Sequence, residues 1–325
     1  MKIFLDTFAK FLGFFSAILV FIIIINFLLY FSNKSKTNFS YLQGDKDSEN
    51  LIAIINIQGP IMSESLNFHN FDIFNSFDVI YPSIIEKYLE ELVRKNVKAL
   101  IITMTSPGGS VSASEQIYKI ISNFKKIHSI PVYFHTNELL TSGAYWVSLS
   151  GDKIYANYGS IIGSIGVKGP DWLYYNDPTL ISNGILGSSV ESPKGIQMFS
   201  NFAGNSKDIF NPFRQPDEKE KLELQKMVDE IYEDFLTIVA SSRKIEKKFL
   251  KEEIGAMFFN SKRAKQYFLI DDQKEINEII DIISNKLKLK NKKIIINTNN
   301  ETYNLFNIPK LMNKNYIDKN MLYKK

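Results

Sequence analysis

Val97-Lys-Ala-Leu-Ile-Ile-Thr-Met104, with Ser106-Pro-Gly-Gly109 close behind it, is the stretch that decides how this chain folds. The first segment is short, apolar and rich in β-branched residues, which is typical of a strand buried on both faces of a mostly parallel sheet. The two glycines after it allow a tight turn in which backbone N–H groups face outward at the start of a helix. We therefore predict a buried strand, a tight turn and a helix, in this order.

Segments on both sides of this stretch repeat the alternation of strand and helix. Leu51-Ile-Ala-Ile-Ile-Asn-Ile57 is a second apolar run, and Pro131-Val-Tyr-Phe134 is a third. Apolar residues at helical spacing lie between these runs, over residues 83–95 and again over residues 113–124. This alternation predicts an α/β fold with a mostly parallel sheet.

A longer helix is predicted over residues 216–243, because the apolar residues of this segment fall on one stripe. We expect the stripe to pack on the sheet or on a neighbouring subunit. Its members are Leu224, Met227, Val228, Ile231, Phe235, Ile238 and Val239.

Residues 11–31 predict a transmembrane helix. They contain no charged residue, and only Gly13, Ser16 and Asn26 interrupt the apolar run. At about 1.5 Å per residue, such a helix matches a bilayer core of roughly 30 Å. A cleavable signal peptide is the alternative, but the bulky residues at the end of the run do not form a small-residue cleavage site. Lysines lie on both sides of the run, so charge leaves the orientation open.

Composition divides the chain into five predicted parts. These are an N-terminal segment over residues 1–10, the transmembrane helix over 11–31, a polar linker over 32–50, a folded domain over 51–284 and a basic tail rich in lysine and asparagine over 285–325.

Charge and composition exclude several classes of function. The chain has no cysteine and only three histidines, so a thiolate or histidine-rich metal site is not expected and no cofactor is predicted. Residues 286–325 hold ten lysines against Glu301 and Asp318, whereas the whole chain has a net charge of +4. The part before the tail is therefore mildly acidic, which argues against a nucleic-acid partner. The tail either contacts anionic lipid or another partner, or is a solvated terminus.

Ser106-Pro-Gly-Gly109 and Ser142 are the first candidates for chemistry. In an acyl-transfer enzyme, outward N–H groups at Gly108 and Gly109 would bind the oxyanion of a tetrahedral intermediate. Ser142 lies in Thr141-Ser-Gly-Ala-Tyr-Trp146, at the start of a predicted helix, where the Gly143 N–H offers a further donor. The alternatives are a simple strand-to-helix turn and an ordinary serine N-cap.

A nucleophilic serine needs a base, and the histidines are poor candidates for this role. His135 ends a predicted strand close to Ser142 in sequence and stays a minor alternative. A lysine serves as a base when burial lowers its pKa from about 10.4 toward neutrality. Lys207, in Gly204-Asn-Ser-Lys-Asp208, and Lys194, in Ser192-Pro-Lys-Gly195, are the two candidates.

Taken together, the motifs resemble those of the signal peptide peptidase A family of membrane-anchored serine proteases, which have the Clp protease/crotonase fold, a ββα superhelix. The similarity covers about residues 51–275 and follows the order of Ser106-Pro-Gly-Gly109, the Ser142 segment, Gly163-Ser-Ile-Gly-Val167 and the Lys207 segment with Pro212-Phe-Arg214. It implies that residues 51–284 form the protease domain. It also implies a bacterial inner-membrane location, with residues 1–10 as an N-terminal cytoplasmic segment and the protease domain outside the cytoplasm.

The resemblance implies a role for each matching residue. Ser142 matches the nucleophile and Lys207 the general base. Ser164 matches a serine that holds this lysine by a hydrogen bond. Gly108, Gly109 and the Gly143 amide correspond to the oxyanion region.

Three features depart from the family pattern. Leu140-Thr141 replace two alanines before the serine. The interval from Ser142 to Lys207 is 65 positions, which is longer than usual and indicates an insertion near residues 172–192. The basic tail has no counterpart in the family. Lys194 would give a more usual interval, but its neighbours do not match the motif.

The function expected from this resemblance is hydrolysis of hydrophobic peptides, such as signal peptides left after cleavage, by a Ser/Lys dyad in a homo-oligomer. A catalytically inactive membrane scaffold that keeps the fold is one alternative. A crotonase-like acyl-CoA enzyme is another, although it needs neither an activated serine nor a membrane span.

Overall fold

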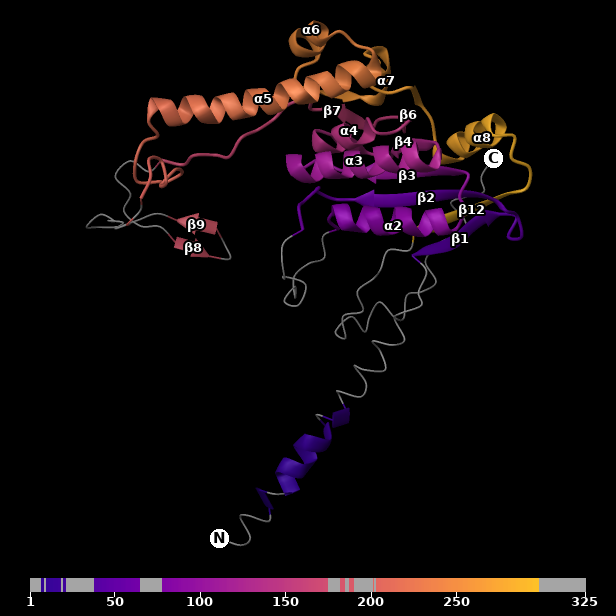
Figure 1. Ribbon diagram of the computed structural model, residues 1–325, viewed down its shortest axis with the longest axis horizontal. Coiled ribbons are helices and arrows are strands. Elements are labelled where there is room, and N and C mark those ends of the chain that lie inside the picture. Colours follow the sequence, from indigo (N-terminus) through magenta and orange to yellow (C-terminus); the bar gives the residue numbers. More distant parts are fainter. Residues whose placement is uncertain are drawn as a thin grey trace.

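The computed structural model describes residues 7–8, 10–18, 20–21, 38–64, 78–174, 182–184, 187–189, 201 and 203–297. Figure 1 shows a layered α/β body from which one long helix extends. The predicted mixed α/β class is confirmed by the alternation of strands and helices along the chain.

The body contains a sheet with the strand order β1-β12-β2-β3-β4-β6-β11. All neighbouring strands are parallel except β1 and β12, which are antiparallel. The central strands are fully buried, apolar runs, as the sequence predicted. The strands are β1 (Phe39–Gly44), β2 (Asn50–Gln58), β3 (Ala99–Thr105), β4 (Val132–Thr136), β6 (Lys153–Ala156), β11 (Asp272–Gln273) and β12 (Lys292–Asn297).

Helices cover both faces of this sheet. The larger core lies on the face covered by α2 (Pro82–Arg94), α3 (Val111–His128) and α4 (Gly143–Ser148). On the other face, α8 (Ile276–Lys286) inserts isoleucines against β2, β3 and β12. The helices and strands predicted between residues 51 and 134 lie within two residues of their expected bounds, except that α3 continues four residues beyond the expected end at 124.

A smaller sheet of three strands lies beside the main one. Its order is β10-β7-β5, where β5 (Leu139–Thr141) and β7 (Ile161–Gly163) are parallel and β10 (Phe258–Asn260) is antiparallel to β7. A short α7 (Ser261–Gln266) follows β10 directly. In this small sheet, β5 leads directly into Ser142 and β7 into Ser164, two of the residues predicted to form the site.

The long predicted helix is α5 (Glu218–Arg243), and only its second half packs on the body. There Phe235, Leu236 and Val239 are buried, and the Phe235 ring stacks on Trp146 at 4.8 Å between centroids. In the first half, Met227 of the predicted stripe keeps 43% of its surface exposed and Leu224 and Val228 are half-buried, while Leu222, which is not part of the stripe, is 68% exposed. The predicted stripe is therefore only half covered within the described part of this chain.

Short elements complete the fold around α5. After it come α6 (Lys247–Phe249) and a π-helical segment, Leu250–Ile254. Before it, within the predicted insertion, β8 (Ser182–Gly184) and β9 (Gly187–Ser189) form an antiparallel hairpin.

Two predicted boundaries need correction. The linker predicted over 32–50 is already folded at Phe39, since β1 pairs with β12. The tail predicted from 285 contains the end of α8 and all of β12, whose Ile294 and Ile295 are buried. Composition misled the prediction here, because the short buried strand stands in a lysine-rich run, in which Lys290 is exposed and Lys292 and Lys293 are half-buried.

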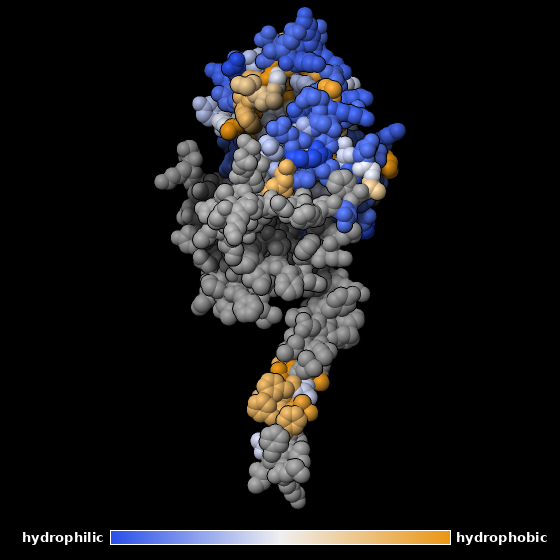
Figure 2. Space-filling model, turned by 90° about the vertical axis from the view of Figure 1, so that its left-hand side faces the viewer, coloured by the Kyte–Doolittle hydropathy of each residue, from blue (hydrophilic) through white to orange (hydrophobic). Residues whose placement is uncertain are grey.

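The predicted transmembrane helix falls partly outside the described residues. Among those that are described, no helix is long and apolar enough to cross a bilayer. The described part of residues 11–21 is helical, and its large apolar side chains form the exposed apolar surface seen in Figure 2.

Candidate active site

Ser142 occupies a strained backbone conformation at the junction of β5 and α4. Its φ is 53° and its ψ is −126°, values that residues other than glycine rarely adopt. Two backbone hydrogen bonds hold it there: the Ser142 N–H donates to Gly163 O at 3.0 Å, and Ser142 O accepts from Trp146 N at 3.0 Å. The hydroxyl caps no backbone group, so the alternative reading of an ordinary N-cap does not fit.

The sequence before Ser142 explains why the strand ends at this point. Leu140 is fully buried in β5, and the Ser106 backbone pairs with this strand through Ser106 N to Leu139 O at 2.8 Å and Thr141 N to Ser106 O at 3.3 Å. Leu140, which departs from the family pattern, is thus a core residue. The strand is anchored on both sides immediately before the strained residue.

The glycines of the predicted oxyanion region lie against Ser142. A Cβ atom placed on Gly108 would lie 2.6 Å from Gly143 N and 2.9 Å from Ser142 Cβ, and one placed on Gly143 would lie 3.3 Å from Gly109 N. The φ of Gly108 is +92° and that of Gly109 is +152°, which glycine alone adopts at little cost. The structure therefore brings together four of the six predicted site residues.

The backbone N–H groups of Gly108, Gly109 and Gly143 differ in whether they already donate a hydrogen bond within the chain. The Gly108 N–H donates to the buried Ser106 Oγ at 3.1 Å. In the described part of the chain, the Gly109 and Gly143 N–H groups donate no hydrogen bond. These two amides are the donors available to an oxyanion, and Gly108 supplies the space that lets them approach.

Ser114 is a site neighbour that the sequence analysis did not single out. Its Oγ donates to Ser110 O at 2.8 Å in the first turn of α3, and a Cβ on Gly143 would lie only 2.3 Å from it. Ser114 is fully buried. The sequence signal that could have identified Ser114 is its position, as a small polar residue one helical turn after Gly108-Gly109.

Ser164 follows β7 and also has a positive φ, 52°. Its N–H donates to Met257 O at 2.8 Å and its carbonyl accepts from Gly166 N at 2.9 Å. Since Gly163 accepts the hydrogen bond from Ser142, Ser164 lies one residue beyond a direct contact of the nucleophile. It is half-buried and thus accessible to a further group.

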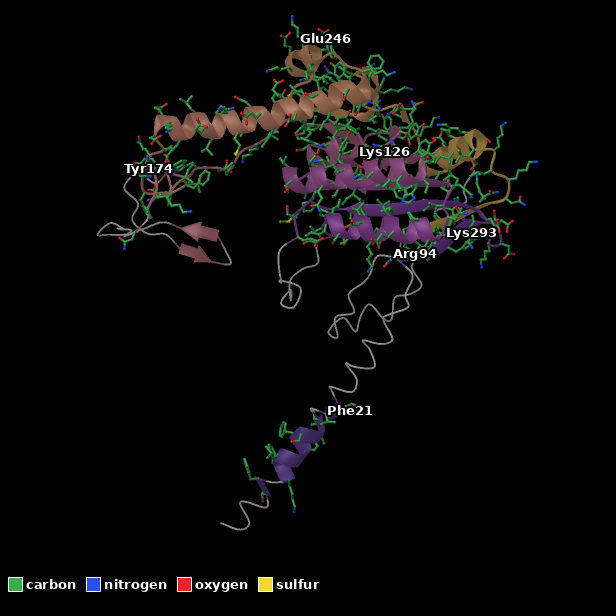
Figure 3. The ribbon with its side chains drawn as sticks, viewed as in Figure 1. Phe21, Arg94, Lys126, Tyr174, Glu246 and Lys293 are labelled. Atoms are coloured by element: carbon green, nitrogen blue, oxygen red, sulfur yellow. The ribbon has the colours of Figure 1, made fainter. Side chains whose placement is uncertain are left out.

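Lys207 is not brought to Ser142 within the described chain. It is exposed in a segment that we call the lysine turn, residues 203–217, and its N–H donates to Gly204 O at 3.4 Å. Figure 1 shows the lysine turn at the outer end of α5, and Figure 3 shows Tyr174 below that end, far from Lys126 in the body. Lys194 lies outside the described residues. The role of Lys207 as the base stays a prediction.

His135 is occupied elsewhere. Its buried ring bonds Asn157 Oδ1 through Nε2 at 2.9 Å. Burial lowers the pKa of His135 below its usual value, although the hydrogen bond to Asn157 acts in the opposite direction. The imidazole is therefore a neutral group of the body, bound to a loop residue.

A groove of about 510 Å³ lies between the start of α3, α4 and α5. Val111, two residues after Gly109, and Trp146, one helical turn after Ser142, form part of its lining. Ile231 and Ile238 of α5 give it a mostly apolar surface. No group of three acidic or histidine side chains that could hold a metal ion occurs in the described ranges.

Comparison with known proteins agrees with this geometry. The model of peptidase family S49 matches residues 124–177 and 180–290, just over half of the chain, so the chain belongs to this family of serine-type peptidases. The match includes Ser142, Ser164 and Lys207. The predicted resemblance to signal peptide peptidase A is confirmed.

Three curated relatives illustrate the similarity. A candidate protease of Methanocaldococcus jannaschii is 33% identical over 54% of this chain and 52% of its own length. A candidate signal peptide peptidase SppA of Enterococcus faecium is 27% identical over 64% of this chain and 56% of its own, and Protease 4 of Haemophilus influenzae is 28% identical over 71% and 34%. The chain thus spans about half or less of the length of these relatives.

Two solved structures show a more distant likeness. The 1510-N membrane-bound stomatin-specific protease, as a mutant with a substrate peptide, has a TM-score of 0.45 at 17% identity, over 77% of this chain and 93% of that one. A ClpP1 mutant from Listeria monocytogenes has a TM-score of 0.42 at 13% identity, over 69% and 92%.

Proposed function

We propose that this chain is a serine endopeptidase of the Clp protease type of fold, in which Ser142 is the nucleophile and Lys207 the general base. The observation that carries the proposal is the conformation of Ser142, whose φ is 53° and whose hydroxyl makes no capping hydrogen bond at the start of α4. Strain of this kind costs about 1–3 kcal/mol and persists where the surroundings enforce it, often at active sites. Membership of family S49 supports the same chemistry.

The mechanism follows from the positions of the donors. The neutral Lys207 amine takes the proton of Ser142 as its Oγ attacks the peptide carbonyl carbon, and the oxyanion binds the Gly109 and Gly143 N–H groups. When the C–N bond breaks, the ammonium returns the proton to the leaving amine. Water then attacks the acyl-enzyme, giving one proton to Lys207, which passes it to Ser142 as the acid leaves.

We further propose that Lys207 reaches Ser142 only in a homo-oligomer. Its place in an exposed turn at the outer end of α5 supports this, as does the uncovered apolar surface of Leu222 and Met227 on the same half-helix. A neighbouring subunit that covered this surface would also supply the burial that an amine needs to lose its proton near neutral pH.

The substrates proposed are hydrophobic peptides derived from membranes, such as cleaved signal peptides. The groove beside Trp146 and Val111 offers apolar surface to a peptide with large apolar side chains, although Glu115 and Asp234 also line it. In this proposal residues 11–31 anchor the chain in the bacterial inner membrane, with the catalytic domain outside the cytoplasm. Digestion by an added protease in sealed right-side-out vesicles tests this orientation, and full protection of the domain would refute it.

A serine-reactive fluorophosphonate probe, applied to the full chain in membranes or detergent, tests the nucleophile. We expect labelling and peptide hydrolysis in the natural protein and neither in Ser142→Ala, while Ser241→Ala, an exposed serine on α5, behaves like the natural protein. Lys207→Ala should lose hydrolysis, whereas Lys221→Ala, which removes an exposed lysine from the first turn of α5, should not. Near-normal hydrolysis in Ser142→Ala or Lys207→Ala contradicts the dyad.

Mixed oligomers test whether subunits share the site. Ser142→Ala and Lys207→Ala chains are inactive separately, but a mixed assembly would contain some intact pairs if each dyad joins two subunits. Activity that returns on co-expression supports the shared site. Its absence, with mixed assembly verified by two affinity tags, indicates a dyad within one chain.

One observation favours the alternative of an inactive scaffold. Lys207 and Ser142 share no contact within the described chain, as expected if the site had lost its base. Complete absence of probe labelling in the folded, assembled natural protein would establish this alternative.

A further inference from the structure

Arg214 ties the lysine turn to the start of α5. Its Nε and Nη2 donate to Asp208 Oδ2 and Oδ1 at 2.7 and 2.8 Å, and its Nη1 and Nη2 donate to Glu220 Oε2 and Oε1 at 2.7 Å each. The Glu220 side chain is only 3% exposed and that of Arg214 30%. Bidentate pairs of this kind combine strong hydrogen bonds with a fixed geometry. One guanidinium thus connects the residue next to Lys207 with the first turn of the helix.

The helix start reinforces the same link. Asp217 and Glu220 form a capping box, in which Glu220 N donates to Asp217 Oδ1 at 2.8 Å and Asp217 N donates to Glu220 Oε2 at 3.0 Å. The hydrogen bonds from Arg214 lower the pKa of Glu220 to about 2, and they also lower the pKa of Asp208. Both carboxyl groups are therefore ionised at neutral pH.

Trp172 joins this cluster to the segment that leaves Ser164. The Arg214 guanidinium lies 5.2 Å from the Trp172 ring, and the Trp172 Nε1–H donates to Asn211 O at 3.2 Å. The Trp172 ring also packs against Phe210 at 5.3 Å between centroids. The lysine turn is thereby held on two sides although it lies away from the core.

We propose that Arg214 is a positioning residue for the lysine base. It fixes the conformation of the turn that carries Lys207, and it binds both oxygens of Asp208 so that this carboxylate does not pair with the neighbouring amine. The inference deepens the proposed function and rests on it. The Pro212-Phe-Arg214 motif has no role in the dyad mechanism itself, and this proposal gives it the role of positioning Lys207.

The effect of Arg214 on the pairing of Asp208 with Lys207 has a simple electrostatic reason. A carboxylate near an amine favours the charged ammonium, and an ammonium cannot act as a base. Among the described residues, the start of α5 adds Asp217 and Glu220 next to the turn, together with Glu218, Lys219 and Lys221. Lys168 and Asp171, which precede Trp172 in the chain, form an exposed pair with each other, 2.9 Å apart. Without Arg214, the carboxylates of Asp208 and Glu220 would face the turn uncompensated.

The test is kinetic and uses the full, assembled protein. In Arg214→Gln we expect kcat for peptide hydrolysis to fall about a hundredfold, the cost of misplacing a catalytic group by about 1 Å. KM should stay within about twofold, because the groove that binds the peptide is unchanged. The acid limb of the kcat profile should move to higher pH. Arg214→Lys keeps the charge but cannot bridge two carboxylates, so it should lose kcat with a smaller movement of the acid limb.

Two further variants make the result specific. Lys221→Gln removes a cation from an exposed ion pair with Glu218 on the same helical turn and should leave kcat and the pH profile unchanged. Adding Asp208→Asn to Arg214→Gln should return the acid limb toward its natural position without restoring kcat.

Defined outcomes overturn the inference. An Arg214→Gln enzyme with natural kcat, or one with an unmoved acid limb, would refute it. A general loss of assembly or melting temperature in Arg214→Gln but not in Arg214→Lys, with a natural pH profile in the latter, would reduce Arg214 to a structural role and also refute it. If Ser142→Ala keeps its activity, the proposed function fails instead, and the two failures are distinguishable.

Discussion

Replacement of Gly108 by alanine tests the geometry of the oxyanion region most directly. The new Cβ would lie 2.6 Å from Gly143 N, 2.9 Å from Ser142 Cβ and 2.9 Å from Thr141 O. Ordinary contacts of this kind are about 3.5–4.0 Å, so the two segments must separate by about 1 Å. A displacement of this size at a reacting group costs about a hundredfold in rate. Loss of one oxyanion donor would give a similar effect of about 10²–10³ in kcat.

Stability must be separated from catalysis, because alanine at a φ of +92° is also strained. Gly159→Ala is the matched control: its φ is +85°, but a Cβ there would meet nothing within 4 Å. Both variants carry a conformational cost of about 1–2 kcal/mol. For a domain of this size, each kcal/mol lowers Tm by roughly 2–4 °C.

The assay compares kcat, probe labelling and Tm for both variants. We expect Gly159→Ala to lose Tm and keep kcat, and Gly108→Ala to lose at least as much Tm together with about a hundredfold in kcat. A Gly108→Ala enzyme within a few-fold of the natural kcat would show that the glycine cluster is not the oxyanion region. An equal loss of kcat in the two variants would show that the effect is one of stability alone.

Three further predictions concern single contacts. Ser142→Gly should be more stable than Ser142→Ala by about 1–2 kcal/mol in urea unfolding, because glycine adopts the positive φ without strain; equal stabilities would argue against the strain. Gly143→Ala should abolish probe labelling, since its Cβ would lie 2.3 Å from Ser114 Oγ, and Ser114→Gly in the same chain should recover part of it; no recovery would place the damage elsewhere. Burial raises the pKa of Asp271, but the hydrogen bonds from Lys153, the Ile154 N–H and Arg243, together with the Arg243 charge, outweigh burial, so the pKa is lowered. Its stabilisation is therefore complete above the unfolded value of about 3.9 and lost as pH falls through the lower folded value, so Asp271→Asn should be less stable than the natural protein at pH 7, with a difference that shrinks below about pH 4. A difference independent of pH would contradict this.

The strands and helices around residues 97–109 were predictable because buried parallel strands consist of short, mostly apolar runs that are easy to recognise in a sequence. β2 and β3 are continuous apolar runs, and the helix between them repeats its apolar residues at helical spacing. β12 escaped prediction because its isoleucines are surrounded by lysines and asparagines. Its burial depends on pairing with β2, which begins more than 200 residues earlier, and no local pattern encodes such a pairing.

The motif order led to the expectation that Ser142 and three glycines lie together, and they do, but it gave no information on the shape of this cluster, and the role of Lys207 stays a prediction. The motif order identified Ser142 and the three glycines, yet the positive φ of Ser142 depends on hydrogen bonds to Gly163 and Trp146, which only the fold supplies. The sequence also did not predict that the Gly108 N–H is already hydrogen-bonded, because its acceptor is the side chain of Ser106. The place of Lys207 could not follow from spacing, since part of the 65-residue interval is the extension that leads to the outer end of α5.

The two halves of the proposed dyad are stabilised in different ways, and this difference bears on how activity would be controlled. Ser142 is held by a strained backbone between two strands and a helix that are almost wholly buried, so its position cannot adjust without disturbing the core. The lysine turn is held by Arg214 through ion pairs near the surface, whose strength falls with ionic strength and with protonation of the carboxylates. A change of conditions or of assembly therefore acts first on the base and only later on the nucleophile. On this reasoning, the position of Ser142 is fixed by the fold, and the proposed hydrolysis is controlled by whether the lysine turn holds Lys207 close to Ser142.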